Sequence, residues 1–290
     1  MNSNDLPSVC QLLDVRLADD FEACHLTGAK NNCLFEVDFA NRLDATAPDP
    51  TAVTVIYGAN GKSGEAPAAL EKLKRLGYSN LHLLEGGLEG ATQAGLTTTI
   101  GKPLPPSPAM PHGRLAVNAG DSVVQWTGRN LLNKHWGTIG ISEGFLDFNE
   151  GMLTGGSIRL NLMALQCTDL QGTDLHDVLI AHLHNDDFFD VSNHPIATLE
   201  ITGSESLPNS AAGAPNLRVN AMLTLRGQTH PIDFDAATGL TPDGHAAAQA
   251  LFSIDRTRWG VLYGSGQLFH RLAGHLVNDM IDFDVKITTS

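Results

Sequence analysis

The densest group of chemically reactive side chains lies in one short stretch, from His182 to Pro195. It contains three histidines, three aspartates and two adjacent phenylalanines. Imidazole and carboxylate groups bind transition metals, and imidazole also exchanges protons near neutral pH. The stretch is therefore a candidate for a metal site or an acid–base site.

A metal site in this half of the chain would draw on His135, His182 and His184. His182 and His184 are two residues apart and point in different directions on a helix, so the pair suits a ligand site only where the helix ends. A zinc site needs about three converging side chains, and a sequence does not show convergence. Asp186 and Asp187 could equally flank the turn after a helix. We therefore favour a structural role and expect no bound metal, with a metal-binding barrel as an alternative.

Length, charge and cysteine content limit the classes of function. A chain of 290 residues suggests two domains. A formal net charge of −14 with 18 Lys+Arg argues against nucleic acid or an anionic membrane surface as partner. No apolar run approaches the ~20 residues of a membrane span. The first residues lack the basic and apolar segments of a secretory signal, and the four cysteines form no Cys-x-x-Cys pair. These features predict a cytoplasmic protein without a membrane span.

A proline-rich segment divides the chain. Proline fixes φ and removes a backbone donor, so a segment crowded with proline is an extended spacer. The sequence predicts a first domain over residues 1–100, a linker over 101–112 and a second domain over 113–290. The prolines of this segment are Pro103, Pro105, Pro106, Pro108 and Pro111.

The two halves differ in hydrophobic pattern. In the first, a buried strand over Val53–Tyr57 precedes a helical pattern over Ala66–Leu76 and a second strand over Leu81–Leu84, which indicates a parallel α/β sheet with flanking helices. In the second, apolar and polar residues alternate, as in Leu217–Leu225 and Ile281–Ile287. Several such strands favour a closed barrel or a sandwich.

Two segments of the second half have helical patterns instead. They are Thr173–Leu183 and Gln267–Leu272. The first of them ends inside the histidine-rich stretch, so that stretch is expected to join a helix to the following strand, Ala197–Thr202. Phe188 and Phe189 would anchor this connection in the core.

Two motifs stand near the start of the first half, Leu12–Arg16 and Cys24–Asn31, and two near its end, Gly77–Tyr78 and Leu84–Leu88. In these motifs and their order the first half resembles a rhodanese domain over residues 8 to 96. Rhodanese domains carry sulfur as a persulfide on a cysteine. That cysteine opens a loop whose amides, together with a helix N-terminus, lower the thiol pKa and hold an anion.

At the position of the family's nucleophile this chain has Gly58. Glycine has no side chain, so the resemblance implies the fold without the sulfurtransferase activity. Cys24 and Cys33 do not lie on the loop and are not expected to replace the nucleophile. A weak anion site is the function left to the loop. The residues that would form it are Asn60, Gly61, Lys62 and Ser63.

Several landmarks follow one another along the second half. They are Val124–Gly128, Lys134–Gly137, Gly155–Ser157, Asp186–Val191, Leu223–Pro231 and Asp255–Gly260. In these landmarks the second half resembles the YceI-like family over residues 113 to 290. The resemblance implies an antiparallel, eight-stranded, lipocalin-like barrel with short helices. It also implies that the barrel binds a long isoprenoid or quinone-like lipid in an apolar cavity, and it suggests a homodimer.

The alternating pattern agrees with such a barrel. Eight strands enclose a space that side chains can fill or that one slender ligand can occupy. Alternation alone does not distinguish these two outcomes. Ala246, Ala248 and Ala250 on one strand would leave room inside, and with the family resemblance we predict a cavity. The candidate ligand-binding residues are Trp126, Leu160, Leu162, Phe188, Phe189, Phe234, Phe252, Trp259 and Phe283.

The sequence thus predicts a protein that binds or carries a lipid and is not an enzyme. No cofactor other than that lipid is expected, and the first domain would serve docking or regulation. One alternative is a sulfur or redox enzyme in which the rhodanese loop holds an anion and the barrel holds a quinone. The other is the metal-binding barrel described above.

Overall fold

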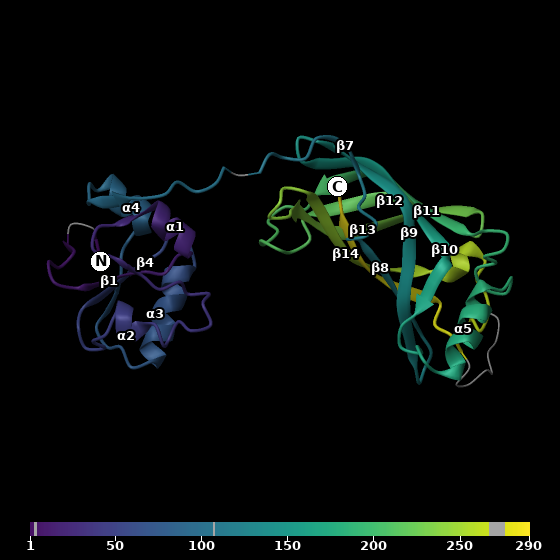
Figure 1. The fold of residues 1–290 in the computed structure, drawn as a ribbon, viewed down its shortest axis with the longest axis horizontal. Helices are drawn as coiled ribbons and strands as arrows, with labels where there is room; N and C mark the ends of the chain where they lie inside the picture. Colours follow the sequence, from purple (N-terminus) through teal and green to yellow (C-terminus); the bar gives the residue numbers. More distant parts are fainter. Residues whose placement is uncertain (3–4, 107, 267–275) are drawn as a thin grey trace. The chain divides into compact units, whose positions relative to one another are not determined.

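The computed structural model describes residues 1–2, 5–106, 108–266 and 276–290 (Figure 1). It contains two compact units, Met1–Ser107 and Pro108–Ser290. Between residues 101 and 112, the described part of the chain contains neither helix nor strand. No helix among the described residues has both the length and the apolar character needed to cross a membrane.

The first unit is built on a parallel sheet with the strand order β3-β1-β4-β5. The central strand β4 is buried along its whole length because helices cover both faces of the sheet, as expected from its apolar run. A separate antiparallel pair joins β2 and β6. The bounds are β1 (Gln11–Asp14), β2 (Cys24–Leu26), β3 (Lys30–Asn31), β4 (Thr54–Tyr57), β5 (Leu81–Leu83) and β6 (Thr98–Ile100).

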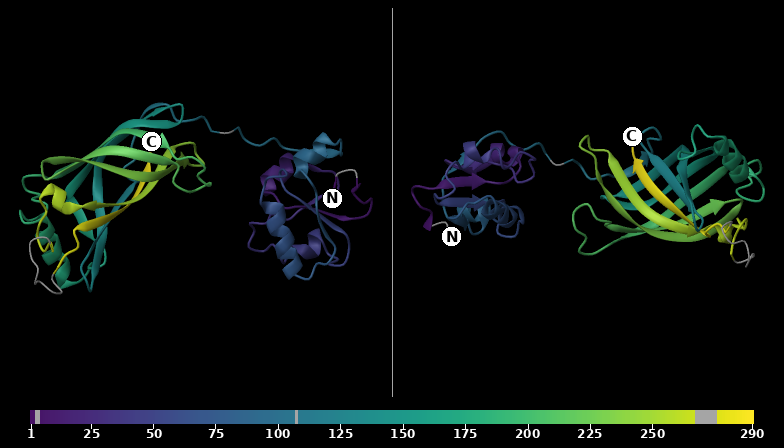
Figure 2. Two further views of the ribbon diagram at one scale, coloured as in Figure 1. Left: turned by 180° about the vertical axis from the view of Figure 1, so that it is seen from behind. Right: turned by 90° about the horizontal axis from the view of Figure 1, so that it is seen from below.

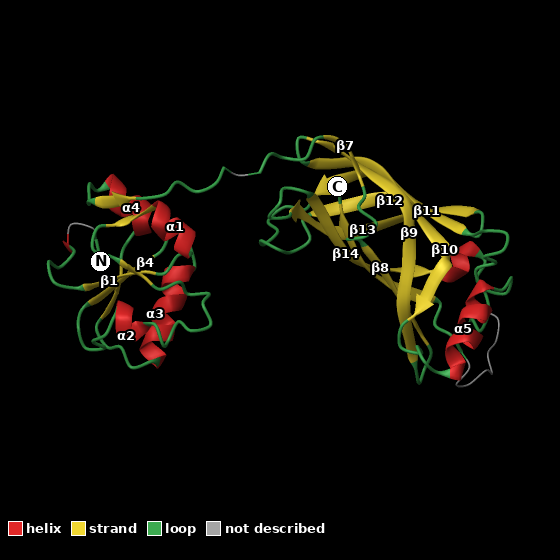
Figure 3. Ribbon diagram, viewed as in Figure 1, coloured by secondary structure: helices red, strands yellow, loops and turns green. Residues whose placement is uncertain are grey.

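The described residues of this unit form four α-helices, which flank the sheet (Figure 3). The longest, α3, buries Ala66, Ala69 and Leu73 against one face, beside Leu13 and Ile56 of the strands. It ends where Gly77 adopts a positive φ of 93°, as expected from the sequence. The helices are α1 (Ala18–Ala23), α2 (Leu43–Thr46), α3 (Glu65–Arg75) and α4 (Gly87–Gln93). The arrangement confirms the predicted α/β fold of the first half.

The second unit is an antiparallel barrel of eight strands, β8 to β15, in which each strand pairs with the next. The barrel closes through the pairing of β15 with β8 and of β8 with β9. The strands are β8 (Val123–Arg129), β9 (Lys134–Asn149), β10 (Met152–Cys167), β11 (Ile196–Ser206), β12 (Leu217–Leu225), β13 (Gln228–Leu240), β14 (Ala246–Asp255) and β15 (Met280–Thr288). The predicted eight-stranded, lipocalin-like barrel is therefore confirmed.

A short strand, β7 (Gly113–Ala116), completes the wall. It pairs with the second half of β9, whereas β8 pairs with the first half. β7 and β8 thus share one position in the barrel, and each pairs with a different half of β9. The two longest strands, β9 and β10, pair with several register shifts, and such irregularities let strands bend around a barrel. Figure 2 shows the curvature from two further directions.

The alternation predicted from the sequence decides which residues face inward. In β12, for example, Leu217, Val219 and Ala221 are buried, while Arg218 and Asn220 between them are exposed.

Helix α5 (Asp174–His184) follows β10 and packs against it, close to the predicted Thr173–Leu183. A short 3-10 helix, η2 (Arg256–Trp259), follows β14. The second predicted helical segment, Gln267–Leu272, lies outside the described part of the chain.

Candidate functional site

The interior of the barrel contains an apolar cavity of about 110 Å³. Every strand from β8 to β15 contributes to its wall, for example Val124 from β8 and Val285 from β15. The polar residues of the lining are Thr238 and Gln249. A ligand that enters this space must therefore be almost entirely hydrocarbon where it meets the wall.

Three aromatic rings stack along one side of this cavity. The ring centroids of Phe234 and Phe252 lie 4.4 Å apart, and those of Phe252 and Phe283 lie 5.5 Å apart. The three residues come from the neighbouring strands β13, β14 and β15. Ala248 and Ala250 of β14 also line the cavity, so two inward positions on this strand carry a methyl group where a larger side chain would fill the space.

A second cavity, of about 270 Å³, shares Ile139, Phe189, Ile281 and Phe283 with the first. Its lining is more polar than that of the first cavity. The polar residues that line it are Arg129, Asn130, His135, His182, Arg256, Tyr263 and Asn278. The two cavities together offer an apolar interior followed by a zone that can hydrogen-bond to a polar group.

Arg256 is the most deeply buried of these polar residues, with an exposed fraction of 0%. Its guanidinium donates hydrogen bonds to four backbone carbonyls and lies 3.5 Å from Asp279. Burial lowers the pKa of Arg256, although Asp279 and Asp255 act to raise it. The sequence-based candidates did not include Arg256, because a buried arginine has no periodic or motif signature of its own.

The structure brings most of the nine candidate ligand-binding residues to the two cavities. Trp259 lines neither cavity; it is fully buried, and its indole Nε1 donates to the carbonyl of Leu223 at 3.0 Å. Six candidates line the first cavity, namely Leu160, Leu162, Phe189, Phe234, Phe252 and Phe283. Those that line the second are Trp126, Phe188, Phe189 and Phe283.

The stretch from His182 to Pro195 joins α5 to β11. Phe188 and Phe189 are buried and pack edge to face at 5.0 Å. Asp190 adopts a positive φ of 49°, and its carboxylate accepts a hydrogen bond from Asn193 Nδ2 at 2.9 Å. This aspartate therefore stabilises the turn. Of the two phenylalanines, Phe189 lines both cavities and Phe188 lines the second.

The three histidines of the alternative metal site do not come together as a set. His135 and His182 line the second cavity, whereas His184 lines neither cavity. The ring of His182 packs edge-on against Phe188 and Tyr263. Within the described residues, the group close enough to share a metal ion is a different one, His135, Cys167 and Asp169.

Asp169 is the centre of that group. His135 Nδ1 lies 2.8 Å from Asp169 Oδ2, and the thiol of Cys167 donates to Asp169 Oδ1 at 3.3 Å. The backbone amide of Trp136 donates to the same carboxylate at 2.9 Å. Burial acts to raise the pKa of Asp169, but these hydrogen bonds outweigh it and the pKa is lowered. Burial first, and then the contact with Asp169, raise the pKa of Cys167 to about 11.

One serine has the spacing of a hydrolase nucleophile, in Gly140-Ile141-Ser142-Glu143-Gly144. A nucleophile of that class stands on a sharp turn between a strand and a helix. Ser142 instead lies inside β9, and its hydroxyl donates to the carbonyl of Arg159 at 3.0 Å. The geometry needed for nucleophilic attack is therefore missing at this serine.

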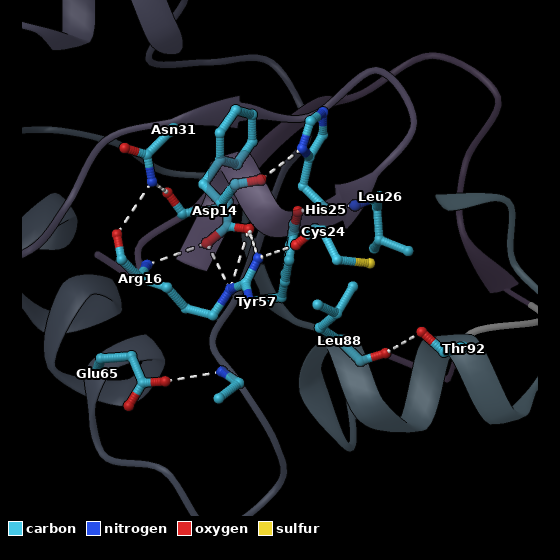
Figure 4. A network of polar contacts seen from close by, with 12 residues as sticks. Asp14, Arg16, Cys24, His25, Leu26, Asn31, Tyr57, Glu65, Leu88 and Thr92 are labelled. Carbon is cyan, nitrogen blue, oxygen red and sulfur yellow. Dashed lines mark hydrogen bonds and ion pairs between the residues drawn. The ribbon is translucent and has the colours of Figure 1, made fainter. Parts of the chain in front are cut away.

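In the first unit, Gly58 directly follows the central strand β4, and the side chain of Glu65 fills the space beside it. A Cβ placed on Gly58 would lie 2.7 Å from Cδ of Glu65 and closer still to Oε1. Glu65 Oε1 accepts a hydrogen bond from the amide of Ala59 at 2.7 Å (Figure 4). Burial acts to raise the pKa of Glu65, but hydrogen bonds from the amides of Ala59 and Glu65 itself outweigh it, and the pKa is lowered. A carboxylate of the chain thus occupies the space that a side chain at position 58 would need.

The loop amides are also used within the loop. The amides of Lys62 and Ser63 both donate to Asn60 Oδ1, at 2.9 and 3.0 Å. The amide of Asn60 donates to Ser63 Oγ at 3.2 Å. Of the predicted anion-binding residues, Asn60 and Ser63 therefore accept hydrogen bonds from three backbone amides of the loop.

Beneath this loop lies a buried ion pair. Asp14 has an exposed fraction of 0%, and Arg16 Nη2 and Nε donate to its carboxylate at 2.6 and 3.0 Å. Arg16 Nη2 also donates to the carbonyl of Cys24 at 2.7 Å, and the amide of Leu26 donates to the Tyr57 hydroxyl (Figure 4). Burial and the neighbouring Asp14 raise the pKa of Tyr57. Arg16 therefore ties the end of β1 to β2, and the Tyr57 hydroxyl ties β4 to β2.

Each half of the chain matches the model of a known protein family. The model of the YceI-like domain matches residues 115–289, and that of the rhodanese-like domain matches residues 2–94. No curated protein matches the chain.

Among solved structures, BcnA of Burkholderia cenocepacia is similar at 15% identity with a TM-score of 0.47, over 60% of this chain and 99% of that one. A polyisoprenoid binding domain from Saccharophagus degradans, implicated in plant cell wall breakdown, is similar at 13% identity with a TM-score of 0.44, over 62% of this chain and 100% of that one.

For the first unit, a thiosulfate sulfurtransferase from Pseudomonas aeruginosa is 34% identical with a TM-score of 0.29. The match covers 31% of this chain and 17% of that one. The rhodanese-like model covers the α/β unit, and the YceI-like model covers the barrel. The chain therefore belongs to the YceI-like family, with a rhodanese-like domain preceding its barrel.

Proposed function

We propose that the barrel binds and carries a long, slender lipid of the isoprenoid or quinone type. The observation that supports this most strongly is the apolar cavity to which all eight strands contribute. Membership of the YceI-like family supports lipid binding as the class of function. The hydrocarbon chain would lie against the stacked rings of Phe234, Phe252 and Phe283, and the polar end in the second cavity.

Recovery of the ligand from purified protein tests this proposal. We expect organic extraction followed by mass spectrometry to yield one class of long-chain lipid in near-stoichiometric amount. Native mass spectrometry of the full chain should show the same added mass. A barrel from which neither method recovers a lipid, and which takes up none from isoprenoid-containing micelles, would contradict the proposal. The mass of the lipid-bound species also tests the homodimer that the family resemblance suggests.

We further propose that the rhodanese-like unit is not catalytic and serves docking or regulation. Gly58 supplies no thiol, and the Glu65 carboxylate fills the space beside it. Asn60 and Ser63 accept hydrogen bonds from three loop amides, which leaves fewer backbone donors for an anionic substrate. The competing function is a sulfur or redox enzyme that uses this loop while the barrel holds a quinone.

The two functions differ in a standard assay. We expect no transfer of sulfur from thiosulfate to cyanide above the rate without protein. Turnover by the wild-type chain that persists after each of Cys10, Cys24, Cys33 and Cys167 is replaced by serine would show sulfur chemistry at a group other than cysteine. Turnover lost with one of them would show that this cysteine replaces the missing nucleophile.

A cysteine introduced at position 58 should react slowly with iodoacetamide because of Glu65. The carboxylate competes for the Ala59 amide and repels a thiolate, and a like charge at this distance raises a thiol pKa by about one unit or more. We expect G58C to be alkylated several-fold more slowly than G58C combined with E65Q, as measured by peptide mass spectrometry of residue 58. Glu71 is an exposed glutamate on the same helix. The control is therefore G58C combined with E71Q, which should react at the same rate as G58C. Equal rates in all three variants would show that Glu65 does not affect the reactivity of a thiol at position 58.

A further inference from the structure

A nitrogen, a sulfur and an oxygen donor lie together at one end of the barrel, and lipid binding does not use them as a set. His135 stands near the start of β9, Cys167 ends β10, and Asp169 follows two residues later. In the barrel, Gly137 of β9 pairs with Cys167, so the start of one strand meets the end of the other. The ligand atoms of the three residues all lie within 4.8 Å of one another.

The spacing of these atoms is close to that of a metal site. In a four-coordinate zinc site with bonds of about 2.0–2.3 Å, neighbouring ligand atoms lie about 3.5 Å apart. Here the distance from His135 Nδ1 to Asp169 Oδ2 is 2.8 Å, and that from Cys167 Sγ to Asp169 Oδ1 is 3.3 Å. The two contacts run to different oxygens of Asp169. Lengthening the first by about 0.7 Å and the second by about 0.2 Å would bring both to the spacing of a metal site.

The surroundings hold the three side chains in place. The amide of Trp136 donates to Asp169 Oδ1 at 2.9 Å and orients the carboxylate, as partners of metal ligands do in known sites. Cys167 is fully buried, which fixes its side chain against β9. His135 is the accessible member, with 37% of its side chain exposed, and it borders the second cavity. An ion can therefore reach the group from that side without opening the barrel wall.

We propose that His135, Cys167 and Asp169 bind a divalent transition-metal ion of the zinc type. Imidazole, thiolate and carboxylate together suit Zn²⁺ and its spectroscopic substitute Co²⁺ better than Mg²⁺ or Ca²⁺, which prefer oxygen ligands. On binding, the Cys167 thiol releases its proton to solvent, and a metal–sulfur bond replaces its hydrogen bond to Asp169. No electron is transferred, so no oxidant or reductant is required. This site does not depend on the lipid proposal.

The set differs from the three histidines that the sequence suggested. The ring of His182 makes T-shaped contacts with the rings of Phe188 and Tyr263. His184 Nε2 is buried and, among the described residues, has no hydrogen-bond partner, but it does not belong to the group. H182A is therefore a matched control, because it removes an imidazole from the same cavity without removing a ligand.

Titration of the untagged full chain with Co²⁺ tests the site. We expect one equivalent to bind with an intense thiolate-to-cobalt charge-transfer band, and Zn²⁺ to abolish the band by competition. The band should persist in H182A and in the variant in which Cys10, Cys24 and Cys33 are all serine. It should disappear in C167A, and Co²⁺ affinity should fall at least tenfold in H135Q and D169N.

Each variant is first shown to be folded by its tryptophan fluorescence. If C167A does not fold, H135Q and D169N decide the result, since their side chains are less buried than that of Cys167. The absence of a charge-transfer band in the wild-type chain would overturn the proposal. So would a band that is lost when Cys10, Cys24 and Cys33 are replaced, or one that survives in both H135Q and D169N at unchanged affinity.

Discussion

Replacing Ala250 by phenylalanine is expected to leave the barrel almost without bound lipid. Ala250 lies on β14 and lines the first cavity, whose volume is about 110 Å³. A cavity of about 150 Å³ holds a benzene molecule, so one phenylalanine ring would fill most of this space. The ring would also lie beside Phe252 and Phe283, where we place the hydrocarbon chain of the ligand.

The measurement is the molar ratio of extracted lipid to protein, determined for A250F beside the wild-type chain. We expect at least a tenfold decrease. L251F is the matched control, because Leu251 is the next residue on the same strand but points outward, with an exposed fraction of 76%. Added volume in a cavity costs less than added volume in a packed core, where overpacking costs about 1–3 kcal/mol, so A250F should stay folded. Lipid content that is unchanged in a folded A250F would place the ligand elsewhere.

Replacing Arg16 by alanine should destabilise the rhodanese-like unit by about 3–5 kcal/mol, the usual effect of removing one partner of a buried ion pair. The Asp14 carboxylate is completely buried and receives three hydrogen bonds of 3.2 Å or less from the Arg16 side chain. Without that side chain, the carboxylate would keep the backbone amide of residue 16 as a donor but would lose its counter-charge. The carbonyl of Cys24 would lose its partner in the same step.

Hydrogen exchange of the β4 amides, followed by mass spectrometry, measures this loss in the full chain. The three tryptophans, Trp126, Trp136 and Trp259, all lie in the barrel, so the tryptophan fluorescence transition reports on the barrel by itself and should not move. R75A removes an exposed arginine at the end of α3 and should change neither signal. A loss below about 1 kcal/mol in R16A would show that the ion pair contributes no more than a surface pair.

Local patterns were sufficient to predict the fold of each half. The buried run Val53–Tyr57 and the helical spacing of Ala66, Ala69 and Leu73 depend on periodicity alone, and they reappear as β4 and α3. The alternation in Leu217–Leu225 likewise reappears as β12, with apolar residues inside. Such patterns are visible in a sequence because neighbours in the chain determine which face of a helix or strand is apolar.

The residues that line the cavities were harder to predict from the sequence. Phe234, Phe252 and Phe283 come together because β13, β14 and β15 pair in a particular register. Trp259 looked equally suitable in the sequence, yet its indole hydrogen bond to Leu223 holds it outside both cavities. Size and aromatic character do not reveal whether a side chain faces a cavity or fills the core beside it.

The sequence by itself determined the two-part fold, the family of each part, and the glycine at position 58, which has no side chain for sulfur chemistry. Only the tertiary structure showed that Glu65 occupies the space beside Gly58, and that Cys167 and Asp169 meet His135 more than thirty residues earlier in the chain. The physical reason is that a missing side chain or an apolar period is a local property of the chain. A contact between distant side chains depends instead on strand register and on how the loops fold back, and neither is encoded in any single stretch of residues.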